Sequence, residues 1–386
     1  MVSASTLYFD ESVLIIIKSI GLYLHIPFCV KKCNYCDFYS VKCSNELMDE
    51  YVKHLEKNIH LWAMKLHDRT VDTIYFGGGT PSVLGTSRIL RILEYIRSSF
   101  NLAEDCEISI EVNPNSTDEL DFFSLKKGGI NRVSMGLQSA DDNELKLLGR
   151  MHTAADAENS INALHKSGID NFSLDVMLGI PLQTYDSLGR TLDFCIDSGA
   201  THISTYMLKI EENTPFYHNK EQLVFADDDL QADLYEFTTK KLKSNGFRHY
   251  EISNFCRTHM ISRHNMKYWM LDDYLGIGPS AHSMIDNKRF YYDRSFDEFY
   301  NNHIVFESEG GTPEEYLMLS LRTDYGFNYE KYKELFKTEL PQCVIDEVRN
   351  LEKLGLINIS DKGFALSEKG FLLSNSVIYR LLSKGI

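Results

Sequence analysis

The sequence predicts an α/β fold, in which a partial (β/α)6 barrel of parallel strands is followed by a smaller, mainly helical domain with a winged-helix-like pattern. Short β-rich runs alternate with segments of helical periodicity. Polar and Gly-rich motifs follow several of these runs, at the strand ends where a barrel builds its site. The alternation ends after Asp227, and 386 residues exceed a usual single core. We therefore expect one large domain and one small domain.

Six strands are expected in the large domain, and because a helical segment follows most of them, they should run parallel. The expected strands cover residues 22–26, 73–76, 107–112, 132–135, 172–177 and 202–206. Apolar residues recur at helical spacing between them. These helical segments cover residues 45–66, 87–100, 118–127, 154–166 and 185–197.

The remaining segments set the expected domain limits. Residues 1–20 are expected to be an N-terminal extension outside the core, and residues 21–246 to form the barrel. Residues 247–311 are polar and rich in aromatics, which suggests a connecting segment. Residues 312–386 combine short helices, two short β-rich runs and a last helix, as expected of the small domain.

Composition excludes several classes of protein. Lys and Arg total 40 against 55 Asp and Glu, and the formal charge of −15 repels nucleic-acid phosphates. The longest apolar run, residues 13–17, is far shorter than the ~20 residues that span a bilayer, and no basic region precedes it as in a secretory signal. Most of the eight cysteines are scattered, which favours free thiols in a reducing compartment. We expect a cytoplasmic protein without a transmembrane segment or a nucleic-acid partner.

Three cysteines, Cys29, Cys33 and Cys36, lie within the segment HIPFCVKKCNYCDF. Thiolates are soft ligands that suit iron-sulfur clusters or zinc. A structural zinc site needs a fourth ligand, which would have to be His25 or Asp37. Inert cysteines are a further interpretation. The spacing favours a four-iron cluster, in which three ligands leave one iron free to bind another molecule.

A glycine run follows the second expected strand, and four polar residues lie in or beside apolar strand ends and helices. In GGGTP, residues 77–81, glycines without a Cβ allow a ligand to approach the backbone, although an ordinary tight turn is the alternative. No Gly-Lys-Ser/Thr follows, which excludes a P-loop. The polar residues would each, taken alone, more often be surface or capping residues. They are Glu111, Gln138, Arg150 and Asp175.

The spacing C-x3-C-x2-C resembles the signature of the radical SAM superfamily, and the glycine run matches an element of the same superfamily. The resemblance implies a [4Fe-4S] cluster whose open iron chelates the amino and carboxylate groups of S-adenosylmethionine. It also implies that an electron from the reduced cluster cleaves the sulfonium bond to give a 5'-deoxyadenosyl radical, which is the cofactor's own chemistry.

Within the superfamily, the polar residues resemble the SAM-contacting residues of oxygen-independent coproporphyrinogen III oxidase and its relatives. The resemblance implies that Arg150 pairs with the SAM carboxylate, since its fork of donors matches a planar anion. It implies that Asp175 and Gln138 contact the ribose or adenosine and that Tyr23 lies near the cluster. The complete set implied for SAM is Tyr23, Gly78, Gly79, Thr80, Glu111, Gln138, Arg150 and Asp175.

One position departs from the true oxidases. They carry a further cysteine two residues after the third ligand, where this chain has Phe38. This difference argues against coproporphyrinogen oxidation. The CDF ending and residues 250–283 resemble instead the heme chaperones of the HemW type. The likeness extends from Gly21 to the C-terminus, where residues 312–386 resemble the HemN C-terminal domain.

The segment HNMKYW, residues 264–269, resembles the HNxxYW element of these chaperones. A heme requires an axial donor such as His and flat apolar surfaces for its macrocycle. The resemblance therefore implies His264 as a heme ligand. A hydrogen-bonded core histidine among packed aromatics is the alternative.

The favoured interpretation is a heme chaperone that binds a [4Fe-4S] cluster, S-adenosylmethionine and heme, and passes heme to an acceptor apoprotein. The alternative is a radical SAM oxidoreductase acting on a porphyrinogen, and a weaker one is a purely structural cluster or zinc protein. The expected partners are heme, the acceptor, an electron donor for the cluster and a second copy of the chain in a homodimer. No residue is assigned a catalytic role.

Overall fold

The computed structural model describes residues 18–114, 116 and 120–386. The first strand, β1, begins at Lys18, so it includes the last three residues of the expected N-terminal extension. Residues 1–17 of that extension lie outside the described part of the chain.

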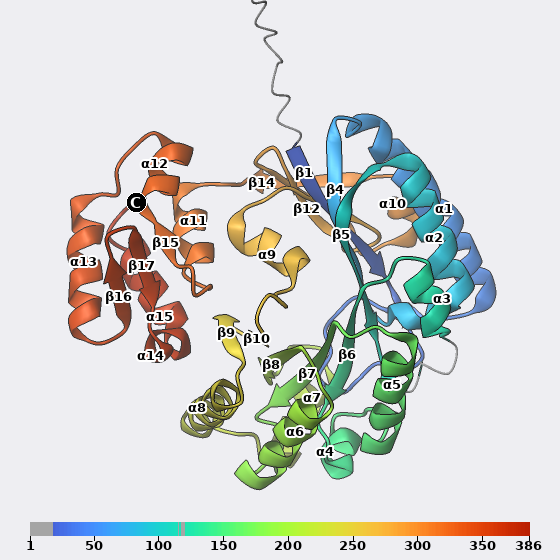
Figure 1. Ribbon diagram of the computed structural model, residues 1–386, viewed down its shortest axis with the longest axis horizontal. Helices are drawn as coiled ribbons and strands as arrows, with labels where there is room; N and C mark the ends of the chain where they lie inside the picture. The colour runs from blue at the N-terminus through green and yellow to red at the C-terminus, as the bar shows by residue number, and fades with distance from the viewer. Residues whose placement is uncertain (1–17, 115, 117–119) are drawn as a thin grey trace, which may run out of the picture.

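The large domain is a curved sheet with helices on its outer face (Figure 1). All six expected strands are present, and each pairs in parallel with the next along the chain. The prediction of a parallel α/β barrel is confirmed, and all six strands are longer than the sequence suggested. They are β1 (Lys18–Ile26), β4 (Arg69–Gly78), β5 (Asn101–Val112), β6 (Arg132–Gln138), β7 (Phe172–Leu178) and β8 (His202–Met207).

Helices follow the strands as expected, and local capping explains where they begin. Thr153 and Asp156 form a reciprocal capping box at the start of α5 (Ala154–Ser167), and Gly168 ends that helix in a left-handed conformation. The short helix α4 (Asp142–Leu147), capped by Asp141, was not predicted because six residues carry too little periodicity. The other outer helices are α1 (Asn45–Lys65), α2 (Gly85–Ser99), α3 (Phe122–Lys127), α5 (Ala154–Ser167), α6 (Tyr185–Asp197) and α8 (Asp228–Ser244).

Alternation along the strands divides the barrel into an apolar outside and a polar inside. In β1, Leu22 and Leu24 are fully buried in the core shared with the helices, whereas Tyr23 and His25 lie on the opposite face. The equivalent inward positions of the neighbouring strands carry Tyr75 and Glu111. The barrel interior is therefore lined by polar groups that need partners.

The connecting segment, residues 247–311, is the part of the fold that the sequence analysis misjudged. It extends the sheet at both edges, to twelve strands in all among the described residues. Two strands add to β8, and four continue the sheet beyond β1, beginning with β11, which runs parallel to β1. These runs of three to six residues interrupted by polar positions did not show as strands. They are β9 (Arg248–Glu251), β10 (Asn254–Cys256), β11 (Tyr274–Ile277), β12 (His282–Ile285), β13 (Lys288–Tyr292) and β14 (Ile304–Glu309).

The same segment contributes α9 (Arg263–Met270), which lies on the concave side of the sheet (Figure 1). The Glu107 carboxylate of β5 accepts the backbone N–H groups of Arg263 and His264, at 3.1 and 3.0 Å. A negative group is favourable at this helix N-terminus. Lys267, which is buried, pairs with Asp72 at 2.8 Å. These contacts fix α9 against the first half of β4 and the middle of β5, as the floor of the barrel interior.

The small C-terminal domain has its own apolar core and a three-stranded sheet in the order β15-β17-β16. It joins the large domain through the β-bridge between Glu251 and Thr323. Its helices and hairpin match the expected winged-helix-like pattern. The elements are α11 (Pro313–Ser320), β15 (Phe327–Asn328), α12 (Tyr329–Phe336), α13 (Gln342–Lys353), β16 (Ile357–Ser360), β17 (Gly363–Leu366), α14 (Glu368–Leu372) and α15 (Ser374–Leu382).

Short elements complete the described chain. Two of them, β2 and β3, pair beside the cysteine loop. No helix among the described residues is long and apolar enough to span a membrane. The short elements are β2 (Phe28–Cys29), β3 (Val41–Lys42), η1 (Pro81–Leu84), α7 (Pro215–His218), η3 (Lys220–Gln222) and α10 (Phe296–Tyr300).

Arg69 links the barrel strand β4 to residues 247–311, which extend the sheet beyond β1. Its buried guanidinium donates to Asp273 at 2.5 Å and to both carboxylate oxygens of Asp286 at 2.8 Å. Since Arg69→Ala leaves Asp273 without this partner, we expect the free energy of unfolding to fall by about 2–4 kcal/mol in urea titrations. Arg91→Ala, which breaks a half-exposed pair with Glu56, should cost less than about 1 kcal/mol. Equal costs would contradict this account.

Candidate functional site

A cavity of about 540 Å³ opens at the carboxyl ends of the parallel strands. β7 contributes residues of the strand itself to its walls, and β1, β4, β5, β6 and β8 contribute residues at or after their carboxyl ends. The structure brings together every cysteine of the motif and all but one of the residues that the sequence analysis assigned to SAM. These lining residues are Cys29, Cys33, Cys36, Gly78, Gly79, Thr80, Glu111, Gln138, Arg150 and Asp175.

Tyr23 is the exception. It does not line the cavity but lies one layer below it, where its hydroxyl and Nδ1 of His25 are 3.1 Å apart. A Cβ at Gly77 would come within 2.8 Å of the Tyr23 ring, so the ring packs directly beneath the glycine run. Tyr23 therefore supports the floor of the cavity in this structure.

The cysteine loop is held from outside the barrel. The backbone N–H of Asn34 donates to the carbonyl of Leu148 at 3.0 Å, and its side chain donates to the carbonyl of Leu147 at 2.8 Å. In turn, the Asn34 carbonyl accepts the N–H of Phe216 at 3.0 Å. One residue between two cysteines thus ties the loop to α4 and α7.

The structure offers no support for a single zinc ion. Among the residues that it describes, no three His, Cys, Asp or Glu side chains are arranged to hold one metal ion. His25, one candidate for the fourth ligand, is buried, and its ring nitrogens contact the Tyr23 hydroxyl and the Tyr39 carbonyl. Asp37, the other candidate, is exposed and does not line the cavity. Three thiols spread over one wall suit a larger inorganic cluster.

The glycine run brings backbone close to the cysteine loop. A Cβ at Gly79 would lie 2.6 Å from the carbonyl oxygen of Phe28, so only glycine fits there. Gly78 has a φ of +116° and donates its N–H to Glu111 at 3.1 Å. The Thr80 hydroxyl lies 3.5 Å from Sγ of Cys29. The run is therefore a close-packed wall of the cavity and not an ordinary exposed turn.

Two carboxylic acids line the cavity in a poorly hydrated setting. Burial raises the pKa of Glu111 to about 7, although hydrogen bonds from the Tyr75 hydroxyl at 2.9 Å and from Gly78 oppose the shift. Burial likewise raises the pKa of Asp175 to about 6, against hydrogen bonds from Ser204 and Ser134. Groups with such shifts in a cavity are characteristic of functional sites.

Asn113 is a site residue that sequence reasoning missed. Its side chain donates to the Thr80 hydroxyl at 3.0 Å and accepts from Nη2 of Arg150 at 2.5 Å. Arg150 also donates to Sγ of Cys33 at 3.5 Å. A continuous chain of contacts therefore runs from Cys29 through Thr80, Asn113 and Arg150 to Cys33. The position of Asn113 directly after β5, at a barrel strand end, was the signal in the sequence.

Arg150 is the main cation of the inner cavity. Burial alone would lower the pKa of its guanidinium, but nearby Tyr35 and Cys33 raise it, so the group stays charged. Nη2 also donates to the Gly136 carbonyl at 2.6 Å. The guanidinium is thus fixed in orientation and can receive an anionic ligand.

Gln138 shows that the cavity is built for a ligand. Its backbone has a φ of +67°, which is strained for a residue with a side chain, and such strain concentrates at binding sites. Its Oε1 atom is buried without a hydrogen-bond partner. An acceptor left unpaired costs about 1–3 kcal/mol, which a donor on a bound molecule would recover.

His264 lies below this layer. It is fully buried, with Nδ1 2.8 Å from the Thr73 hydroxyl and Nε2 2.9 Å from the hydroxyl of Tyr268. Burial lowers the pKa of its imidazole to about 3, so it is neutral. In this conformation both ring nitrogens are occupied, and the geometry gives no support to heme ligation by His264. That role stays a prediction which requires both contacts to break.

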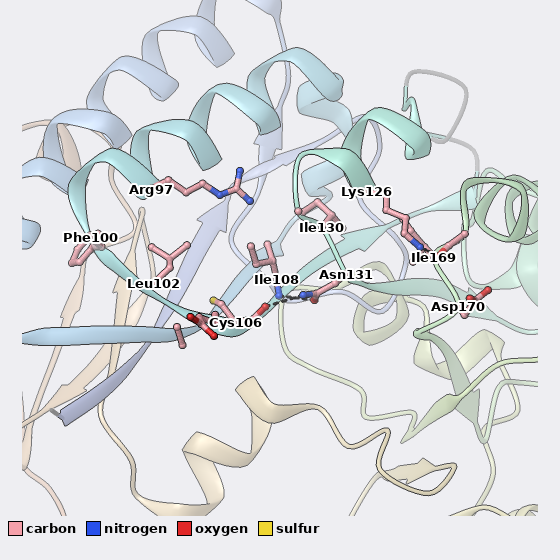
Figure 2. Close-up of a pocket in the computed structure, with 14 residues that line it drawn as sticks. Arg97, Phe100, Leu102, Cys106, Ile108, Lys126, Ile130, Asn131, Ile169 and Asp170 are labelled. Atoms are coloured by element: carbon pink, nitrogen blue, oxygen red, sulfur yellow. Dashed lines mark hydrogen bonds between the residues drawn. The ribbon is translucent and has the colours of Figure 1, made fainter. Parts of the chain in front are cut away.

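A second cavity, of about 620 Å³, opens at the opposite end of the strands (Figure 2). The two cationic side chains that line it both bind backbone carbonyls. Arg97 donates to the Gly128 carbonyl at 2.6 Å, and Lys126 donates to the Gly168 carbonyl. Such contacts satisfy the carbonyls that helix ends leave free. Cys106 also lines this cavity, but burial raises the pKa of its thiol to about 12. We assign no second reactive centre to these residues.

Comparison with known proteins identifies the family. Residues 23–195 match the model of the radical SAM superfamily, and residues 312–373 match that of the HemN C-terminal domain. The heme chaperone HemW of Buchnera aphidicola from Schizaphis graminum is 33% identical, over 93% of this chain and 97% of its own length. HemW of Bacillus subtilis is 31% identical, over 94% and 99%. This chain belongs to the HemW family of radical SAM proteins.

The HemW family relationship agrees with the fold. Coproporphyrinogen III oxidase from Escherichia coli, described as a radical SAM enzyme, superposes with a TM-score of 0.80 over 97% of this chain and 93% of its own, at 22% identity. A bovine relative, radical S-adenosyl methionine domain-containing protein 1, is 32% identical over 94% of this chain and 87% of its own length. The predicted recognition and fold class are confirmed.

Membership in the radical SAM superfamily assigns a [4Fe-4S] cluster and S-adenosylmethionine to the protein. The cavity fits both groups. It offers three thiols on one wall, a glycine backbone into which no Cβ would fit, and the unpaired Gln138 acceptor. These features meet at the strand ends where the sequence analysis expected them.

The contact chain through Asn113 predicts that this residue stabilises the cluster. Asn113→Ala removes the link between Thr80 and Arg150, so the thiols of Cys29 and Cys33 should be less well oriented. Loss of such supporting contacts typically costs about 10–100-fold in metal affinity. We expect iron to be lost to a chelator faster by a similar factor, with altered electron paramagnetic resonance of the reduced cluster. Asn159→Ala, on the exposed face of α5, is the control. Unchanged iron release would refute the role.

Glu111 should make the free energy of unfolding of the protein without cofactors depend on pH. Because burial raises its folded-state pKa to about 7, above the unfolded value of about 4.5, stability is lost as the pH rises from 4.5 through 7. Glu111→Gln should therefore be more stable than the wild type at pH 8, by about 1–3 kcal/mol, and the gain should shrink towards pH 5. The midpoints of urea unfolding of the variant and the wild type, compared at each pH, measure this difference in stability. Glu158→Gln, exposed on α5, should show no such trend.

Proposed function

We propose that this protein is a heme chaperone, which binds heme and passes it to an acceptor apoprotein. The observation that carries the proposal is the end-to-end match with HemW proteins at 31–33% identity, over more than nine-tenths of both chains. The cofactor cavity and the C-terminal domain are both present, so the similarity is not confined to a cofactor-binding module.

The cysteines and Arg150 of the cavity suit the binding of the cluster and of the S-adenosylmethionine carboxylate. Cys29, Cys33 and Cys36 would ligate three irons of the cluster as thiolates. When bound together, the reduced cluster and S-adenosylmethionine supply one-electron chemistry. The Arg150 guanidinium would pair with the carboxylate of S-adenosylmethionine.

The other cavity residues would orient S-adenosylmethionine. The backbone of Gly78 and Gly79, with Thr80, can approach its amino end closely, because no Cβ intervenes at the glycines. Glu111 lies beside this wall and would accept from the ammonium group. Asp175 and Gln138 would accept from the ribose or adenosine, which gives the unpaired Oε1 of Gln138 a donor.

Phe38 favours the chaperone over a radical SAM oxidoreductase acting on a porphyrinogen. It stands where the true oxidases carry a further cysteine, and its side chain is 67% exposed at the edge of the cavity. A phenyl ring can neither ligate iron nor exchange a proton. The cavity supports cofactor binding in both interpretations, so turnover has to be measured to separate them.

The remaining partners are part of the same proposal. Transfer requires an acceptor apoprotein, and reduction of the cluster requires an electron donor. We propose a cytoplasmic location, in keeping with the eight free cysteines of the described chain. A homodimer is proposed as the assembled form.

Heme titration of the anaerobically reconstituted protein tests the function. We expect a Soret band that saturates at micromolar heme, and transfer of that heme to an apoprotein acceptor. Because both ring nitrogens of His264 are engaged, His264→Ala should weaken folding, and it should weaken heme binding only if both hydrogen bonds of the ring open. Absence of heme binding, or efficient conversion of coproporphyrinogen with S-adenosylmethionine and a reductant, would overturn the proposal.

A further inference from the structure

The mouth of the cofactor cavity has an apolar surface that the cofactor assignments leave unused. Phe38 lines the rim with a side chain that is 67% exposed, and Tyr206, which is 42% exposed, lines the same cavity further in, near Asp175 and Glu111. Met207 and Leu208 add apolar wall beside Tyr206. Exposed apolar side chains that share one cavity mark an interaction site more often than single scattered ones do. The thiols and the glycine run occupy the less exposed part of the same cavity.

Three lysines lie on the same opening. Lys31, Lys32 and Lys209 are exposed and line the cavity. Lys209 pairs with Glu211 at 2.6 Å, whereas Lys31 and Lys32 have no carboxylate partner among the described residues. This positive charge is concentrated in a chain whose formal charge is −15. A ligand for this mouth should combine flat apolar surface with carboxylates.

We propose that heme docks at this mouth, with its macrocycle against Phe38 and Tyr206 and its propionates on Lys31 and Lys32. The inference rests on the proposed chaperone function and locates its ligand. Aromatic side chains pack against flat ring systems, and lysines pair with carboxylates at distances that need no deep pocket. Heme held at an open rim remains accessible to an acceptor protein.

Heme titration of the reconstituted, S-adenosylmethionine-bound protein tests the location. Phe38→Ala should raise the Kd for heme by about tenfold, which corresponds to ~1.4 kcal/mol. Lys31→Glu/Lys32→Glu should raise it as well, with a loss of salt dependence. Phe123→Ala is the matched control, because Phe123 is also 67% exposed but lies on α3, outside the cavity. Lys53→Glu/Lys57→Glu, exposed on α1, controls for net charge.

The ligand can be varied to check the same contacts. Heme dimethyl ester, in which both carboxylates are blocked, should bind the wild type more weakly than heme and should not distinguish the lysine variant. Iron content and circular dichroism confirm that each variant is loaded and folded. Wild-type binding with unchanged affinity in both mouth variants would overturn the location and leave the chaperone function standing. Absence of binding in the wild type would overturn both.

Discussion

The site depends on one hydrogen-bonded chain that links two cysteines across the top of the barrel. It passes from Cys29 through Thr80, Asn113 and Arg150 to Cys33. Its members come from four separate parts of the sequence, so the chain exists only when the parallel strands are correctly aligned. The orientation of the two thiols therefore depends on the folded barrel. A cluster ligated by a loop alone would lack this coupling.

The cavity is costly for the protein without its cofactors. Glu111 and Asp175 are acids in a poorly hydrated space, and Gln138 combines a strained backbone with an unpaired acceptor. Each feature lowers stability, and each provides a group to which a bound molecule can give a proton donor. The apolar outer face of the strands, packed against the helices, supplies the stability that offsets this cost.

Most of this site could be predicted from the sequence because the carboxyl ends of all the parallel strands lie at the same end of a barrel. Three cysteines, the glycine run, Glu111, Gln138 and Asp175 lie in or directly after parallel strands, towards their carboxyl ends, and these ends meet at one edge of the sheet. Asn113 escaped because an Asn before Pro reads as a turn residue. The short strands after residue 247 escaped because their pairing depends on the edges that β1 and β8 leave open, which no local pattern records.

In the HNMKYW segment of α9, the family resemblance implies that His264 ligates heme, whereas both ring nitrogens of His264 are within hydrogen-bond distance of hydroxyl groups in this structure. Its His264 is buried beneath Tyr23 and Tyr75, with ring centroids 6.4 and 5.2 Å away, and its helix is anchored by Glu107 and Lys267. These contacts close the floor of a polar barrel. The ring of Tyr23 in turn packs under the glycine run. The helix therefore supports, through Tyr23, the wall of the cavity that the glycine run forms. The exposed aromatic and basic residues lie at the opposite end of the cavity, at its mouth.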